Sequence, residues 1–253
     1  MSNLPKTPSF RLDGKSALVA GASRGIGFAC ATALAEAGAA VVMAARDADR
    51  LRAAAEMLWS EGFHASPVEL DITDQAAVAQ MFRNNGPFDI LVNSAGTARH
   101  TPALDATEED YDRVMELNAK YAFFLAREAA KGMKAKGGSI IQISSQMGLV
   151  GGQERAVYCA SKHALEGMTK AMAIEWGSYG IRVNTLCPTF IRTELTTDTF
   201  ADPEKEKWIR SKIKLGRIGE VEDVMGAVVF LASEASAMVT GTHLLIDGGW
   251  TAG

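Results

Sequence analysis

The stretch YCASKH, at 158–163, carries two pairs of side chains that could do acid–base chemistry. Tyr158 and Lys162 stand four residues apart, and so do Cys159 and His163. In a helix each pair would share one face, and the two faces would be rotated by about 100°. A lysine can stabilise the phenolate of a tyrosine and lower its pKa, whereas an imidazole can activate a thiol. The spacing alone does not decide between the two pairs.

Short apolar runs alternate with longer helical patterns along most of the chain, and these elements must position the reactive residues. The expected strands are residues 16–20, 40–44, 66–70, 89–92, 139–144, 181–186 and 242–246. The expected helices lie near 25–37, 48–62, 73–84, 107–133, 157–177 and 220–233. Several runs are continuously apolar, which is typical of parallel strands covered on both faces. The alternation predicts a single-domain α/β protein, a doubly wound parallel sheet of about seven strands with helices on both faces, as in the Rossmann fold.

One irregular stretch interrupts this alternation. Residues 189–216 are polar and carry a short helical pattern around Trp208, between a strand and the last helix. Such a segment is suited to a lid over a binding site. No linker, repeat or low-complexity tract divides the sequence, so we expect residues 1–253 to form one domain.

Three glycines follow the first expected strand and open the first expected helix. Gly21, Gly25 and Gly27 allow a tight turn and a close approach of the backbone to a phosphate. The N-terminus of the helix would add N–H donors and positive potential. A nucleoside-triphosphate loop is excluded because no Lys-Ser or Lys-Thr pair follows the last glycine. A dinucleotide site is favoured, and a tight turn without a ligand is the alternative.

The end of the second expected strand lacks the acidic residue that would bind a ribose 2′-hydroxyl. Ala45 and Arg46 stand there instead, and Arg24 lies inside the glycine turn. Two guanidinium groups are suited to a 2′-phosphate through charge-assisted bonds, so NADP(H) is favoured over NAD(H). Two alternatives stay open. Both arginines could be solvated, or Asp47 could reach the ribose after a one-residue shift of the turn.

The composition argues against several other classes of function. A net charge of -4 and a pI near 5.7, with no dense Lys/Arg cluster, argue against a nucleic-acid partner. No apolar run is long enough to span a bilayer, so we expect no membrane partner. The three cysteines lie in apolar stretches without metal-ligand spacing, which indicates buried thiols in a reducing, cytoplasmic compartment: Cys30, Cys159 and Cys187.

The histidines show no metal-binding arrangement with acids or cysteines, so no metal is expected. His100, in the segment GTARHTPAL, could touch a substrate, but a histidine on a surface loop is the simpler interpretation. Cys159 and His163 lack an evident third group that would orient the imidazole. This pair is therefore expected to be packing.

Several motifs resemble those of the short-chain dehydrogenase/reductase family, and they follow the family's order along nearly the whole chain. AGASRGIG (20–27) resembles the family's glycine turn, with Ala20 in place of threonine. NSAG (93–96) resembles the N-N-A-G segment after the fourth strand, and YCASK (158–162) matches the Y-x-x-x-K motif. The set is far more specific than any one motif.

Two further segments extend the resemblance to the cofactor. LD (70–71) resembles the segment whose acid meets the adenine, and CPTFIRT (187–193) resembles the segment beside the nicotinamide carboxamide. The cofactor-binding residues implied in this way are Gly21, Ser23, Arg24, Gly25, Ile26, Gly27, Arg46, Asp71, Ile72, Asn93, Ala95, Gly96, Tyr158, Lys162, Pro188, Ile191 and Thr193. The expected substrate-binding residues are Ser145, Met147, Gln153 and Tyr158.

The resemblance also implies a catalytic set. Tyr158 would give or take a proton, and Lys162 would stabilise the phenolate and hold ribose hydroxyls. Local chemistry leaves Ser144 and Ser145 equivalent, but the family's separation of serine and tyrosine, matched by 158 − 145 = 13, selects Ser145 to orient the substrate oxygen. Asn118 would hold a water that links the lysine to solvent. Because it falls on an apolar stripe, a buried structural amide is its alternative role.

The resemblance therefore implies an NADP-dependent oxidoreductase that interconverts a secondary alcohol and a ketone. It could be like a carbonyl or 3-oxoacyl reductase, or like a polyol or sugar dehydrogenase. A catalytically silent dinucleotide-binding sensor or scaffold on the same fold is the alternative. The expected partners are a small carbonyl or alcohol substrate and further copies of the chain, as a homotetramer.

Overall fold

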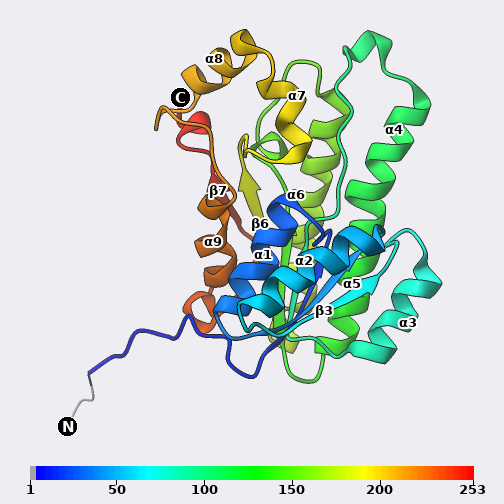
Figure 1. Ribbon diagram of the computed structural model, residues 1–253, viewed down its shortest axis with the longest axis vertical. Coiled ribbons are helices and arrows are strands. Elements are labelled where there is room, and N and C mark those ends of the chain that lie inside the picture. The colour runs from blue at the N-terminus through cyan, green and yellow to red at the C-terminus, as the bar shows by residue number, and fades with distance from the viewer. Residues whose placement is uncertain (1–3) are drawn as a thin grey trace.

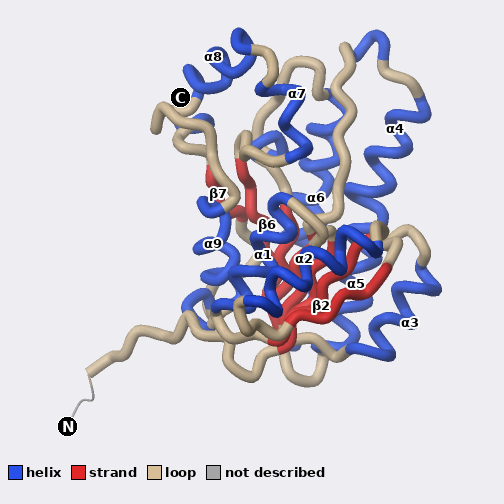
Figure 2. The backbone as a smooth tube through the Cα atoms, viewed as in Figure 1, coloured by secondary structure: helices blue, strands red, loops and turns tan. Residues whose placement is uncertain are grey.

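Seven parallel strands form one sheet at the centre of the computed structural model, which describes residues 4–253 (Figures 1 and 2). The strand order is β3-β2-β1-β4-β5-β6-β7. The strands span Ser16–Ala20 (β1), Ala40–Ala45 (β2), Ala65–Glu69 (β3), Ile90–Asn93 (β4), Gly138–Ile143 (β5), Ile181–Pro188 (β6) and His243–Ile246 (β7). Every expected strand is present within two residues of its predicted bounds, and the predicted fold class is confirmed.

The helices cross over between successive strands. They span Gly25–Glu36 (α1), Ala48–Ser60 (α2), Gln75–Asn85 (α3), Glu108–Met115 (α4), Tyr121–Met133 (α5), Ala156–Trp176 (α6), Thr197–Phe200 (α7), Pro203–Lys212 (α8) and Glu222–Ala232 (α9). In Figure 1, α7 and α8 lie at the top of the view, close to the C-terminus. No helix within residues 4–253 has the length and apolarity needed to cross a bilayer.

The alternation of side chains along each strand divides the core into two layers. In β1, Ala17 and Val19 pack into the layer formed with α1, α2 and α9. Leu18 and Ala20 point the other way and pack with α3, α5 and α6. Because both faces of the sheet are covered, each strand must be apolar at every position, which explains the continuous apolar runs.

The single helix expected at 107–133 is two helices joined by a π-helical turn at Glu116–Lys120. Thr107 begins α4 as expected, and its hydroxyl accepts a hydrogen bond from the backbone N–H of Asp110. The Asp110 carboxylate forms an ion pair with Arg99, at 3.3 Å. The π turn carries Asn118 and is the one feature of this helix that the periodic pattern did not predict.

The strand order reverses between β1 and β4, and ligands of such sheets bind in the crevice outside the carboxyl ends of the strands at this point. The glycine turn follows β1, and the chain after β4 lies against it. A Cβ at Gly21 would lie 2.9 Å from the backbone nitrogen of Ala95, and a Cβ at Gly27 would lie 2.1 Å from the carbonyl oxygen of Gly21. Only glycine permits this close packing of turn, helix and neighbouring loop.

The glycine turn supplies a stability test with a matched control. We expect Gly27→Ala to destabilise the protein by about 1–3 kcal/mol, because the new methyl group must displace a backbone carbonyl. Gly167→Ala, in the middle of α6 where nothing lies within 4 Å of the new Cβ, should stabilise it by about 0.5–1 kcal/mol. Thermal unfolding followed by circular dichroism measures both changes. A Gly27→Ala protein that unfolds at the wild-type temperature would contradict this account of the turn.

Candidate active site

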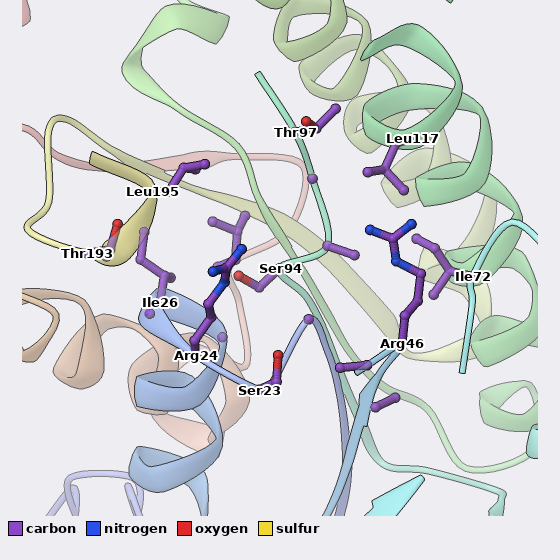
Figure 3. Close-up of a pocket in the computed structure, with 18 of the residues that line it drawn as sticks. Ser23, Arg24, Ile26, Arg46, Ile72, Ser94, Thr97, Leu117, Thr193 and Leu195 are labelled. Carbon is purple, nitrogen blue, oxygen red and sulfur yellow. The ribbon is translucent and has the colours of Figure 1, made fainter. Parts of the chain in front are cut away.

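A cleft with a volume of about 740 Å³ opens at the reversal of strand order. Its wall contains most of the expected cofactor residues: Gly21, Ser23, Arg24, Gly25, Ile26, Gly27, Arg46, Asp71, Ile72, Ala95, Gly96, Tyr158, Lys162 and Thr193. Figure 3 shows side chains from the glycine turn, from the end of β2 and from the segment after β6 pointing into this space. The expected residues Asn93, Pro188 and Ile191 do not line the cleft.

Asn93 and Ile191 have structural contacts of their own. The Asn93 amide donates to Gln142 at 2.9 Å, and its oxygen accepts from the backbone N–H of Ala95 at 3.2 Å. Ile191 is buried and forms an isolated bridge with Gly219. These residues support the loops that line the cleft.

The two arginines expected at the cofactor have different surroundings. Arg46 forms no ion pair within residues 4–253, and its guanidinium points into the cleft (Figure 3). Arg24 donates to the carboxylate of Glu194 at 2.8 Å, and Arg50 donates to the same oxygen at 2.7 Å. Arg50 and Glu194 were not predicted from the sequence, because contacts between exposed residues 144 and 170 positions apart leave no periodic pattern.

Asp47, the acid that could have bound a ribose, lines the cleft next to Arg46. Its carboxylate caps α2 by accepting a hydrogen bond from the backbone N–H of Arg50 at 3.0 Å. The last residue of β2 is Ala45, which is paired with Glu69 of β3. At the end of β2 the cleft is therefore lined by the guanidinium of Arg46, and the carboxylate of Asp47 caps α2.

Tyr158 and Lys162 share one face of α6 and both line the cleft. Burial raises the pKa of the Tyr158 phenol, and the Ser145 hydroxyl and the charge of Arg155 oppose this shift. The net shift is upward, and Lys162 is not among the groups that oppose it. The lysine Nζ lies 5.7 Å from the centre of the phenol ring and donates to the carbonyl oxygen of Ile143 at 2.9 Å.

The Lys162 ammonium is buried at the carboxyl end of β5, and only 6% of the residue is exposed. Burial lowers its pKa to about 8, against the opposing attraction of Cys187 and Glu166. The Glu166 carboxylate is also buried and accepts hydrogen bonds from the Thr185 hydroxyl at 2.9 Å and the Cys187 thiol at 3.3 Å. Glu166 stands four residues after Lys162, and this spacing could have drawn attention to it.

Asn118 is buried in the π turn, 1% exposed, and both ends of its amide are bonded. The oxygen accepts from the backbone N–H of Thr97 at 2.8 Å. The nitrogen donates to the carbonyl of Thr97 at 2.8 Å and to the hydroxyl of Ser161 at 3.1 Å. These bonds tie the π turn to the loop after β4 and to α6, which is the structural role left open by the sequence.

The rival pair has no activated thiol. The Nδ1 atom of His163 lies 2.9 Å from the backbone carbonyl of Cys159, so the imidazole bonds to the helix and not to sulfur. All three cysteines are free and buried, as predicted. No cluster of potential metal ligands occurs in residues 4–253.

Ser145 begins a short 3-10 turn at Gln146–Gly148. Its hydroxyl accepts from the backbone N–H of Met147 at 3.1 Å, and Met147 is buried. Gln153 is exposed. Gln146 is 1% exposed, and within the described residues neither polar atom of its amide has a hydrogen-bond partner.

The cleft fits a dinucleotide. The glycine turn gives the backbone the close approach that a phosphate requires, and α1 begins at Gly25 with no side-chain cap and no acidic residue in its first turn. Such a cofactor would exchange a hydride with the substrate when bound. With Tyr158 and Lys162 on the same wall, the fold and site define a nucleotide-binding oxidoreductase of the Rossmann class.

Comparison with known proteins gives the family. The model described as enoyl-(acyl carrier protein) reductase matches residues 21–251. Gluconate 5-dehydrogenase of Gluconobacter oxydans is 41% identical over 247 residues, which cover 96% of each chain. Human L-xylulose reductase is 38% identical over 243 residues, which cover 95% of this chain and 98% of the relative.

The solved structures agree. A gluconate 5-dehydrogenase of Burkholderia cenocepacia, in complex with NADP and tartrate, is 37% identical and superposes with a TM-score of 0.92 over 96% of this chain and 98% of the other. The chain belongs to the short-chain dehydrogenase/reductase family and is an NAD(P)-dependent enzyme of that family.

The buried ammonium supplies a test of stability against pH. Lys162 has a pKa of about 8 in the folded protein and 10.5 as its ordinary value, so the unfolded chain binds more protons across this window. Stability therefore rises as pH increases from about 8 to 10.5, and the charge costs up to about 3 kcal/mol at pH 7. We expect Lys162→Met to unfold at a higher temperature than the wild type at pH 7, with a smaller difference near pH 10.

Differential scanning calorimetry at both pH values measures this change. Lys170→Met, at an exposed position of the same helix, is the matched control and should show no such pH dependence. A Lys162→Met protein that is less stable than the wild type at pH 7 would mean that the contact with Ile143 outweighs the cost of burying the charge.

Proposed function

We propose that the protein is an NADP-preferring oxidoreductase that interconverts a secondary alcohol and a ketone on a hydroxyl-rich, sugar- or polyol-type substrate. The observation that carries this proposal is the shared wall of the cleft. Tyr158 and Lys162 line the same space as the glycine turn and Arg46, so a proton donor and a dinucleotide site lie together.

In this proposal Tyr158 is the general acid and base. Its raised pKa keeps the phenol protonated at neutral pH, so it can donate to a carbonyl oxygen as hydride reaches the carbonyl carbon. Ser145, which interacts with the phenol, orients the same oxygen. Lys162 binds the ribose hydroxyls. Asn118 holds the loop after β4 in place and also binds the water that links the lysine to solvent.

Two observations support the substrate class. Relatives that share most of the chain are named for reactions of polyhydroxylated compounds: gluconate 5-dehydrogenase, D-threitol dehydrogenase, D-erythrulose reductase and L-xylulose reductase. The buried amide of Gln146, beside Ser145, has both a free acceptor and a free donor among the described residues, which suits a substrate hydroxyl. A silent sensor on this fold is the weaker candidate because all four expected catalytic residues are present.

The preference for NADP rests on Arg46 together with the position of Asp47 as a helix cap. The cofactor in the Burkholderia relative is also NADP. Residues 189–216 would act as the lid, since Glu194 from this segment reaches Arg24 and Arg50 on the cofactor side of the cleft. The enzyme would work in the cytoplasm.

We also propose that the chain forms a homotetramer. β7 is the edge strand of the sheet, and Leu245 on this strand is 37% exposed. Met238 and Ile174 are exposed large apolar residues at 99% and 83%. Such side chains suit an interface between copies, and sedimentation equilibrium gives the mass of the native particle.

Replacement of the phenol tests the function. We expect Tyr158→Phe to lower kcat/KM for sugar and polyol substrates by roughly 10²–10⁴-fold while it leaves the Kd of NADPH within a few-fold of the wild-type value. In the wild type, alcohol oxidation should accelerate from pH 7 towards pH 10, since the phenol must lose its proton first and its pKa is raised. Substantial turnover by Tyr158→Phe would refute the assignment of the proton donor.

Replacement of one arginine tests the cofactor. Arg46→Ala should raise the KM of NADPH by roughly 10- to 100-fold, as expected for loss of a charge-assisted contact, and leave the KM of NADH almost unchanged. Arg52→Ala, an exposed residue of α2 that does not line the cleft, is the control. A wild-type enzyme that strongly prefers NADH would overturn the proposed preference.

A further inference from the structure

The guanidinium of Arg155 lies among three segments that meet on the substrate side of the cleft. Its Nη1 atom is 2.9 Å from Nε2 of His100, in the loop after β4. Its Cζ atom lies 5.2 Å from the centre of the Phe190 ring, in the segment after β6. Its stem passes Gly152, where an added Cβ would lie 2.9 Å from Cδ of Arg155 and 2.8 Å from Sδ of Met147.

This guanidinium stands beside the proton donor. The His100 ring that it contacts packs edge-on against the ring of Tyr158, with centroids 6.2 Å apart and an angle of 81° between the planes. The charge of Arg155 also acts on Tyr158 directly, because it opposes the rise in the pKa of the phenol. A short substrate whose carbonyl contacts Tyr158 would therefore be long enough to place an anionic group on Arg155.

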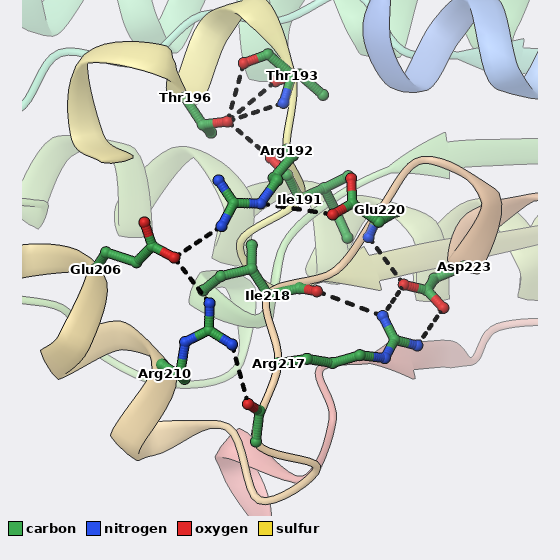
Figure 4. Close-up of polar contacts among 11 residues, drawn as sticks. Ile191, Arg192, Thr193, Thr196, Glu206, Arg210, Arg217, Ile218, Glu220 and Asp223 are labelled. Carbon is green, nitrogen blue, oxygen red and sulfur yellow. Dashed lines mark hydrogen bonds and ion pairs between the residues drawn. The ribbon is translucent and has the colours of Figure 1, made fainter. Parts of the chain in front are cut away.

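Arg155 differs from the other arginines of this region in having no carboxylate partner. Figure 4 shows Arg192 and Arg210 bonded to Glu206, and Arg217 bonded to Asp223. Within residues 4–253 no carboxylate oxygen lies within 4.0 Å of the Arg155 nitrogens, although the side chain is half-buried. A partly desolvated charge without a counter-ion is costly, and a substrate anion would compensate for it.

His100 is the polar side chain in contact with this guanidinium. Desolvation and the adjacent Arg155 charge lower the pKa of His100 to about 4, so the ring is neutral at physiological pH. Both ring nitrogens face the guanidinium, since Nε2 lies 2.9 Å and Nδ1 lies 3.3 Å from the same Nη1 atom of Arg155. The neutral ring can therefore accept a hydrogen bond from Arg155 and orient it. The nearest carboxylate along the chain belongs to Glu154, an exposed residue that attracts Arg155 only weakly. The position thus presents donors and positive charge, which suits a carboxylate.

We propose that Arg155, oriented by His100, binds the carboxylate of a sugar acid, so that the substrate is an aldonate and not a neutral polyol. This inference rests on the proposed function. The carboxylate takes no part in the reaction: a carbinol carbon further along the substrate loses its hydride to the oxidised cofactor, and Tyr158 takes the hydroxyl proton. The products are a ketoaldonate, the reduced cofactor and one proton.

Matched pairs of substrates test the proposal. D-Gluconate and D-glucitol differ only in a carboxylate against a hydroxymethyl group, and so do threonate and threitol. We expect the wild type to oxidise the acids with a kcat/KM at least about 10-fold above that of the alditols, as expected for a charge-assisted contact. Arg155→Gln should lower the value for the acids by roughly 10- to 100-fold and the value for the alditols much less. Arg155→Lys should recover part of the loss.

The ratio of kcat/KM for the acids to kcat/KM for the alditols distinguishes binding of the carboxylate by Arg155 from a purely structural role of this residue. If Arg155 only anchors the segment after β6 through Phe190, Arg155→Gln will lower kcat/KM equally for both kinds of substrate, and the proposal is wrong. A wild type that oxidises the alditols as well as the acids overturns the proposal and leaves the proposed function standing. A wild type that oxidises neither group, in a full panel of sugar acids and polyols, overturns both. Arg52→Gln, far from this position on α2, is the control and should leave the ratio unchanged.

Discussion

The hydrogen bond from the Lys162 ammonium to the carbonyl oxygen of Ile143 is the contact on which the geometry of the site depends. It joins α6 to the last residue of β5, in the middle of the sheet. Because a buried ammonium needs a partner, α6 cannot rotate about its axis without losing this bond and leaving the charge unpaired. Tyr158 stands one helical turn earlier, so the bond that holds the lysine also fixes the direction of the phenol.

The inner face of α6 is held by polar contacts as well as by packing. Ser161 accepts from Asn118 of the π turn, and Glu166 accepts from Thr185 and Cys187 of β6. Buried groups of this kind have few alternative partners, so they select one position of the helix among the many that apolar packing would tolerate. The helix that carries Tyr158 is thus held in one position by buried polar groups. Burial of Lys162 in the same helix lowers the pKa of its ammonium.

The strands and the helix that carries Tyr158 and Lys162 could be predicted because their signals are local. Apolar runs covered on both faces and a four-residue spacing of Tyr158 and Lys162 are visible in a short window of sequence. The π turn was not predicted, since one additional residue in a helical turn changes no periodic pattern over the helix as a whole. Arg24 was expected at the cofactor phosphate, yet its guanidinium also bonds Glu194. His100 is an exposed loop residue, as expected, but its contact with Arg155 was not predicted. Contacts between charged residues far apart in sequence depend on the assembled fold.

The segment after β6 carries acids and aromatic rings to opposite sides of the same cleft. Glu194 contacts Arg24 and Arg50 on the cofactor side, and Phe190 covers Arg155 on the substrate side. Within the described chain, Arg46 and Arg155 keep guanidinium groups without carboxylate partners, whereas Arg192 in this segment is neutralised by Glu206. In a protein of net charge -4, such unpaired guanidinium groups attract anions to the places where they lie. Selectivity for a phosphorylated cofactor and for an acidic substrate would then have the same physical cause. In both places a positive charge without a carboxylate partner lies where the ligand carries its negative charge.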